Sequence, residues 1–281
     1  MAIQKKPAAN KNLDSIRKTI ANHKRYDFIF ASLGTLVIAS LTITLLILFL
    51  DLVIDGYPRF NLDFFSNFPS RRAARAGILS AWIGSSLVLL VTFFVAVPLG
   101  ITSGVYLEEY AKKNWFSDLI EINVSNLAGV PSIIYGLLAL GLFVYSFGLG
   151  QSILTAGLTL ALLMLPIVIV STREAIRSIP VHIREAAYAV GATKWQVCRN
   201  HVIPYSYGGI LTGVIIGMAR AIGETAPVIT IGALTFIAFL PPSPIGLEPP
   251  FINFDWLDSG FTVLPIQMFN WISRPQLAFH I

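Results

Sequence analysis

The most restrictive feature of the sequence is a stretch of 51 residues, from 122 to 172, without a single Asp, Glu, Lys or Arg. A helix crosses the hydrocarbon core of a membrane with about 20 residues, so this stretch is long enough for two crossings. Uncharged stretches also occupy residues 28–50 and 78–107. The whole chain is 55% hydrophobic and 12% charged, whereas average soluble domains are about 25% charged. We therefore expect a membrane protein, because a soluble chain of this composition would expose large apolar patches.

The charged segments predict the topology. Fourteen Lys and Arg residues lie in the amino-terminal tail, a turn at 108–121 and a polar segment at 173–200, and five lie in the segments assigned to the outside. Because Lys and Arg are enriched in cytoplasmic loops, we expect the amino terminus and the polar segment in the cytoplasm. The expected order is a basic tail at 1–27, a first transmembrane helix at 28–50, an outer loop at 51–77 and a core at 78–281. Within the core we expect one span at 78–107, kinked or ended near Pro98 and Gly100, two spans at 122–172, joined near 147–152, and one span at 205–240. An outer segment rich in Pro and aromatic residues follows.

The polar segment at 173–204 is the best candidate for a contact with a soluble protein. A helix is predicted over 181–190 with Ser178 as its N-cap, and a second over 193–201. From spacing alone, a solvated connector between two spans explains the segment equally well. The alternative is a helix that enters a groove on another protein. Three alanines are predicted to leave one face of the first helix low, that is, without large side chains: Ala186, Ala187 and Ala189.

Two charges interrupt the apolar stretch at 205–240. Arg220 and Glu224 are four residues apart, which places them on one face of a helix. An unpaired Arg in the middle of a membrane costs at least about 2.5–3.5 kcal/mol. Pairing offsets part of this cost, yet an apolar pair would be no less stable. The pair is therefore a candidate functional site, and the alternative is a salt bridge that holds helices together.

Residues 185–204 resemble a known family motif. They read EAAYAVGATKWQVCRNHVIP, which is similar to the cytoplasmic coupling loop of ATP-binding-cassette (ABC) importer permeases. Glu185, Ala186 and Ala187 precede Gly191 by the family's spacing, and nine further residues separate Gly191 from the closing residues 201–204, which end on Pro204. It departs from the family at 201 and 203, where His and Ile replace the usual Ile and Leu. The resemblance implies an all-α type I importer transmembrane domain whose loop docks into an ATPase subunit.

A second, more selective resemblance points to phosphate-importer permeases, and to their A-type subunit in particular. Residues 219–227 read ARAIGETAP, similar to the signature of these permeases, and the runs GVPSIIYGL at 129–137 and PLGITSGVYLEEY at 98–110 fit the same family. The resemblance covers the chain from about residue 77. It implies substrate translocation by Arg220, Glu224 and Thr225, coupling to the ATPase by Glu185, Ala186, Ala187 and Gly191, and helix shaping by Gly223, Pro227 and Pro131.

The carboxylate beside the arginine suggests a basis for selectivity. An arginine fork fits phosphate, sulfate and molybdate alike. Only a protonated phosphate can donate a hydrogen bond to Glu224, whereas sulfate would meet it with like charge. Selection of phosphate by Glu224 is therefore an expectation, alongside selection by a separate binding protein.

The family resemblance also implies partners and a location. These are a homologous permease, two copies of an ATPase and a periplasmic phosphate-binding protein, in a bacterial inner membrane. The sequence contains no phosphate-binding GxxxxGK[ST] loop, so ATP and Mg²⁺ are expected on the ATPase, and no cofactor or enzymatic activity on this chain. Six spans are typical of the family, so we expect a sixth span to be missing, because the sequence stops near 274–281 where it would begin.

Other readings of the sequence remain open. Cys198, the single cysteine, is expected to fill space in a helix, and His182 with Glu185 lacks the further ligands of a metal site. The basic residues do not gather on one nucleic-acid-reading element. The alternatives to a phosphate importer are an importer of sulfate or molybdate, a proton-coupled carrier that uses Glu224, and an intramembrane enzyme, for which no nucleophile and base are found in facing spans.

Overall fold

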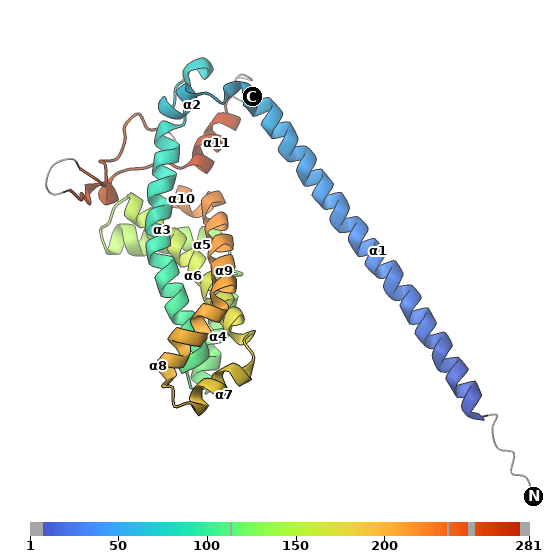
Figure 1. Ribbon diagram of the computed structural model, residues 1–281. Helices are drawn as coiled ribbons and strands as arrows, with labels where there is room; N and C mark the ends of the chain where they lie inside the picture. The colour runs from blue at the N-terminus through green and yellow to red at the C-terminus, as the bar shows by residue number, and fades with distance from the viewer. Residues whose placement is uncertain (1–7, 113, 235, 247–250, 276–281) are drawn as a thin grey trace, which may run out of the picture. The chain divides into compact units, whose positions relative to one another are not determined.

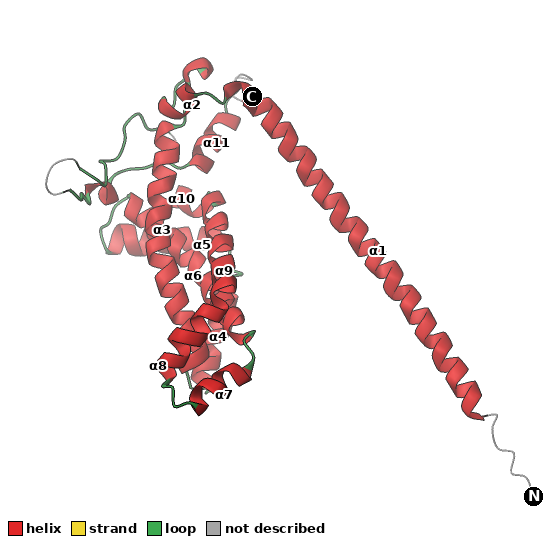
Figure 2. Cartoon of the chain, in the orientation of Figure 1, coloured by secondary structure: helices red, strands yellow, loops and turns green. Residues whose placement is uncertain are grey.

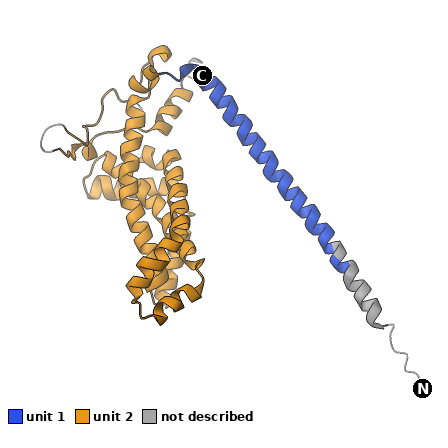
Figure 3. Ribbon diagram, in the orientation of Figure 1, with its two compact units in different colours: residues 1–61, 281 blue, residues 62–280 orange. Residues whose placement is uncertain are grey.

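The protein is helical throughout the part that the structure describes (Figure 2). This computed structural model describes residues 8–112, 114–234, 236–246 and 251–275, without the side chains of residues 8–18, 21 and 22. A single isolated bridge, between Ile245 and Ile252, is the β pairing in those residues. The chain divides into two units, residues 1–61 with 281, and residues 62–280 (Figure 3). The fold confirms the all-α prediction.

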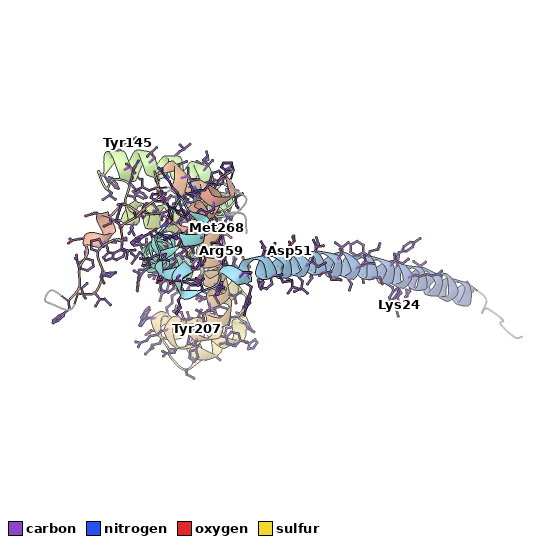
Figure 4. The ribbon with its side chains drawn as sticks, turned by 90° about the horizontal axis from the view of Figure 1, so that it is seen from above. Lys24, Asp51, Arg59, Tyr145, Tyr207 and Met268 are labelled. Carbon is purple, nitrogen blue, oxygen red and sulfur yellow. The ribbon has the colours of Figure 1, made fainter. Side chains whose placement is uncertain are left out.

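The first unit is one long helix, α1 (Ala8–Gly56), followed by a 3₁₀ turn, η1 (Tyr57–Arg59). Its apolar part contains the predicted span at 28–50, and no residue of the most apolar stretch is buried. Side chains stand out on all sides of the helix (Figure 4), with Lys24 toward one end and Asp51 toward the other. The helix also continues into the predicted tail and outer loop. Residues 1–7 of that tail lie outside the described residues.

The second unit contains the bundle (Figure 1). Its elements in chain order are α2 (Leu62–Ser66), the 3₁₀ turn η2 (Ala73–Arg75), α3 (Leu79–Val105), the π-helical turn η3 (Tyr106–Tyr110), α4 (Trp115–Leu127), α5 (Ser132–Ala139), the π-helical turn η4 (Leu140–Ser146), α6 (Ile153–Arg177), α7 (Val181–Ala189), α8 (Lys194–Val197), the π-helical turn η5 (Cys198–Val202), α9 (Ile203–Gly223), α10 (Ala226–Thr230), the 3₁₀ turn η6 (Asp255–Asp258) and α11 (Leu264–Ile272).

Helix α6 is the centre of this unit, and α3 and α9 pack against it. The contacts are close because small residues recur every fourth position, as in other membrane helix pairs. A Cβ added to these glycines would press against side chains of α6. The pairs are Gly100 with Val168, Gly104 with Thr172, Gly209 with Ala175, Gly213 with Ser171 and Gly217 with Met164. The bundle is therefore held by close backbone approach as well as by apolar side chains.

The membrane spans differ from the predicted ones in their bounds, and they reach the predicted number of five only if one bent helix pair counts as a span. Four helices are long and apolar enough to cross a membrane, and α4 with the α5–η4 segment makes a fifth if this pair, bent by 105°, is one span. If the bent pair is one span, it and α6 are the two spans predicted over 122–172, and they join at the predicted turn. The span predicted at 205–240 is wrong: it runs from Lys194 to Gly223 and breaks there. Pro98 does not end α3, which continues to Val105.

The carboxyl-terminal segment is partly core. Trp256, in the segment predicted to be outer and rich in Pro and aromatic residues, is 5% exposed and packs in the apolar cluster that includes Phe143 and Phe261. The neighbouring Trp271 lies on α11 and contacts the ring of Phe64. The prediction about a missing sixth span falls largely on residues 276–281, which lie outside the described residues.

Candidate functional site at a helix break

The candidate translocation site lies where α9 ends. Arg220 is in the last turn of α9, and Glu224 is the C-cap residue with an extended backbone. Arg220 Nε donates to Glu224 Oε1 at 3.2 Å, which confirms that the two side chains pair. They do not lie in the middle of a continuous span, as the sequence suggested, because the helix stops between them. The Arg220 side chain is 43% exposed and that of Glu224 17%.

The helix end suits the positive charge. Carbonyl groups at the carboxyl end of a helix carry partial negative charge, which favours a cation in the last turn by about 0.3–1 kcal/mol. Thr225 is the residue before α10, and Pro227 lies in the first turn of α10, where the missing N–H of proline does no harm. A Cβ on Gly223 would meet nothing within 4 Å. Its predicted shaping role is therefore not explained by crowding within this chain.

The ARAIGETAP and GVPSIIYGL motifs meet in space. Helix α10 packs on α5, and a Cβ on Gly136 would overlap Thr230 Oγ1 and stand 2.7 Å from Pro227 Cα. Pro131 is the residue before α5 and follows the bend from α4. Tyr135 fixes that bend, because its hydroxyl donates to the carbonyl of Leu127 at 2.7 Å. Two broken helices thus face each other beside the Arg220–Glu224 pair.

A small pocket of about 10 Å³, enough for about one water molecule, adjoins Glu224. Glu224 is the charged residue among its lining residues, which otherwise are mostly apolar side chains of α3, α6 and α9, such as Val88 and Leu160. The hydroxyl of Ser85, also in the lining, accepts a hydrogen bond from the Leu264 N–H at 2.9 Å. The pocket therefore presents one carboxylate in apolar surroundings.

The predicted coupling segment forms two short helices, α7 and α8, at the end of the unit away from α2 and α11 (Figure 1). Gly191 takes a φ of +84°, a left-handed conformation that suits glycine, at the turn between them. Thr193 and Gln196 form a capping box that starts α8. The two-helix prediction is confirmed. The predicted cap is wrong, because Ser178 ends α6 and Pro180 precedes α7.

The alanines of this segment separate into two faces. Glu185, Ala186 and Ala189 are exposed, whereas Ala187 is 6% exposed and packs with Ile176. The prediction of a low face made by all three alanines is therefore wrong, since Ala187 lies beneath the surface that a partner would touch. In the part of the chain that the structure describes, no three His, Cys, Asp or Glu side chains gather as a metal site would require.

An ion-pair network at the same end was missed by the sequence reasoning. Two arginines of α6 bind glutamates that follow α3 and lie in α4, with nitrogen–oxygen distances of 2.6 Å for Arg173 with Glu121, 2.9 Å for Arg177 with Glu108 and 3.0 Å for Arg177 with Glu121. Arg184 of α7 binds Glu109 at 2.9 Å. The available signal was the opposite sign of two segments: the acids cluster at 108–121 and the arginines at 173–184. In the topology prediction the arginines count only toward the side of the membrane, and the glutamates do not enter it.

Comparison with known proteins identifies the family. Residues 96–248, more than half of the chain, match the model of the binding-protein-dependent transport system inner membrane component. The chain belongs to this family. It is 32% identical to the probable ABC transporter permease protein YqgI of Bacillus subtilis (strain 168) over 260 residues, which cover 92% of this chain and 83% of that protein. The chain is thus a multi-pass permease of a binding-protein-dependent ABC importer.

Other similar proteins are named as phosphate transport permeases. The chain is 37% identical over 72% of its length to the phosphate transport system permease protein PstA of Mycobacterium leprae (strain TN), and 36% identical over 63% of its length to that of Yersinia pestis. It spans less than two thirds of these permeases, 62% and 60% respectively. The matches agree with the resemblance drawn from the GETAP run.

Proposed function

We propose that this permease is the A-type membrane subunit of an ATP-driven phosphate importer. The observation that carries the proposal is the Arg220–Glu224 pair, placed at a break between α9 and α10 rather than inside the packed bundle. The likeness to two PstA proteins supports phosphate as the substrate. Helix breaks that carry polar groups at membrane depth are typical of transport sites.

The pair has the chemistry to bind an oxyanion. In the described residues Arg220 is bonded through Nε alone, so its two Nη groups have donors to offer a tetrahedral anion. Its 43% exposure places it on the surface of this subunit. A homologous permease that covered this surface would enclose the arginine between the two subunits, and phosphate would pass there. Thr225 follows directly and can add a hydroxyl.

Energy enters from partner chains in this proposal. Two ATPase subunits bind ATP and Mg²⁺, and the exposed face of α7, with Glu185 and Ala186, docks on one of them. The turn at Gly191 orients this face, while Ala187 supports it from below. A periplasmic phosphate-binding protein delivers the substrate on the outer side. The basic tail and α7 then both lie in the cytoplasm of a bacterium, and the chain crosses its inner membrane.

Replacement of Arg220 tests the proposal directly. Arg220→Gln keeps a polar side chain of similar reach and removes the charge, so we expect phosphate uptake to fall to background. Arg220→Lys keeps the charge but loses the planar fork, so uptake should be reduced less severely. Uptake is measured in cells lacking their own phosphate importer, and membrane insertion and co-purification with the other subunits are the controls. Normal uptake by Arg220→Gln would assign Arg220 a structural role.

A further inference from the structure

The guanidinium of Arg184, in the predicted coupling segment, is fixed by contacts with a carboxylate and with two backbone carbonyls. Its Nε and Nη2 both reach Glu109 Oε1, at 3.0 and 2.9 Å. Its Nη1 donates to the carbonyl of Ile179 at 3.0 Å, and Nη2 also donates to that of Ile176 at 2.9 Å. The side chains of Arg184 and Glu109 are 18% and 9% exposed. One guanidinium thus binds α7 to the end of α6 and to the turn that follows α3.

These bonds are a large part of what connects α7 to the spans. Helix α7 buries one residue, Ala187. A nine-residue helix with so little buried surface is weakly fixed by packing alone. A charged fork with three hydrogen bonds and one further ion-pair contact fixes both position and orientation. A displacement of α7 would therefore move Glu109 with it or break a largely desolvated ion pair.

Glu109 belongs to a helical segment that also reaches the candidate translocation site. It lies in η3, which extends α3, and α3 contributes Ser85, Val88 and Leu89 to the pocket at Glu224. About 20 helical residues separate the two ends, or roughly 30 Å at 1.5 Å per residue. The small residues of α3 pack closely on α6, so α3 is supported along this length. One continuous helix thus joins the Arg184 clamp to the pocket.

We propose that Arg184 is the positioning residue that transmits movement of the ATPase-bound α7 through Glu109 to α3, and so to the pocket beside Glu224. This inference rests on the proposed coupling of α7 to an ATPase. Arg184 itself contacts neither nucleotide nor phosphate. Without the clamp, α7 still docks and ATP is still hydrolysed, but the movement no longer reaches the spans.

The test replaces the whole clamp, so that no buried charge is left unpaired. Substitution of a buried ion pair by apolar residues of similar size is often neutral for stability, whereas removal of one partner is destabilising. We therefore combine Arg184→Met with Glu109→Met. The exposed Lys112, on the same end of the unit, supplies the matched control as Lys112→Gln.

Three quantities are measured in the reconstituted importer: phosphate transported per ATP hydrolysed, thermal unfolding, and a cross-link from Ala186→Cys to the ATPase in a Cys198→Ser background. We expect transport per ATP to fall by about tenfold, within the range that mutations along such connections produce. The cross-link and the unfolding temperature should stay near the wild-type values, and Lys112→Gln should behave as wild type.

Two outcomes would overturn the inference. Coupling equal to wild type in the double variant would show that the clamp transmits nothing. Loss of the cross-link would show that Arg184 only shapes the docking surface. Failure of the proposed function itself is distinguishable, because the wild-type assembly would then lack ATP-driven phosphate uptake, or the Ala186→Cys, Cys198→Ser chain with its clamp intact would not cross-link to the ATPase.

Discussion

Glu224 differs from Arg220 in its surroundings, and the difference bears on selectivity. The carboxylate is 17% exposed and adjoins an apolar pocket, whereas the guanidinium is 43% exposed. A carboxylate in such surroundings acts as a hydrogen-bond acceptor that is costly to leave unpaired. We propose that protonated phosphate satisfies this acceptor and that sulfate does not, so that Glu224 distinguishes two anions that Arg220 attracts equally.

Neutralisation of Glu224 should therefore relax selectivity. Glu224→Gln keeps an acceptor oxygen for phosphate and adds an amide donor that sulfate can use. We expect the preference for phosphate over sulfate to fall by about tenfold or more, because the like-charge repulsion is removed and the amide donates a hydrogen bond that sulfate can accept. The measurement is uptake of labelled phosphate by the assembly in the presence of increasing sulfate. An unchanged preference would leave selection to the binding protein.

At the scale of elements, the unit depends on close helix contacts that a single methyl group can test. Gly213 and Gly208 both lie inside α9. A Cβ at Gly213 would overlap the hydroxyl of Ser171 on α6, whereas a Cβ at Gly208 would meet nothing within 4 Å. The two positions share helix propensity and differ in packing.

Gly213→Ala should therefore destabilise the protein where Gly208→Ala does not. Overpacking typically costs about 1–3 kcal/mol, and alanine gains up to about 1 kcal/mol over glycine in a helix. We expect Gly213→Ala to lower the free energy of unfolding in detergent and Gly208→Ala to leave it unchanged or raise it. Equal effects of the two substitutions would mean that α9 does not pack on α6 through Gly213.

The elements that sequence reasoning located well were those set by long apolar runs. The uncharged stretches predicted the spans, and the turn at Gly191 predicted the α7–α8 pair. The break after Gly223 was missed because residues 225–240 are as apolar as a span, and only Pro227 indicated an interruption. Ala187 was misplaced because a short helix shows no clear period. The Arg184–Glu109 clamp joins residues 75 positions apart, and single-sequence reasoning has no rule for such distant partners.

The whole molecule is a permease whose two candidate functional regions lie at different depths of one bundle. The helix break with Arg220 and Glu224 adjoins the pocket near one end of α3, and the exposed face of α7 lies beyond the other end. This separation is expected of a subunit that handles substrate in the membrane and receives energy in water. A proton-coupled carrier that uses Glu224 would need no such docking face.

The source of energy is thus the most direct test of the account. Phosphate uptake is measured in proteoliposomes that contain this permease with its homologous permease, ATPase and binding protein, and in proteoliposomes that contain this chain alone. We predict uptake that requires ATP and the full assembly, that is absent with Arg220→Gln, and that does not respond to a pH gradient without ATP. Uptake by the chain alone, driven by a pH gradient, would contradict the account.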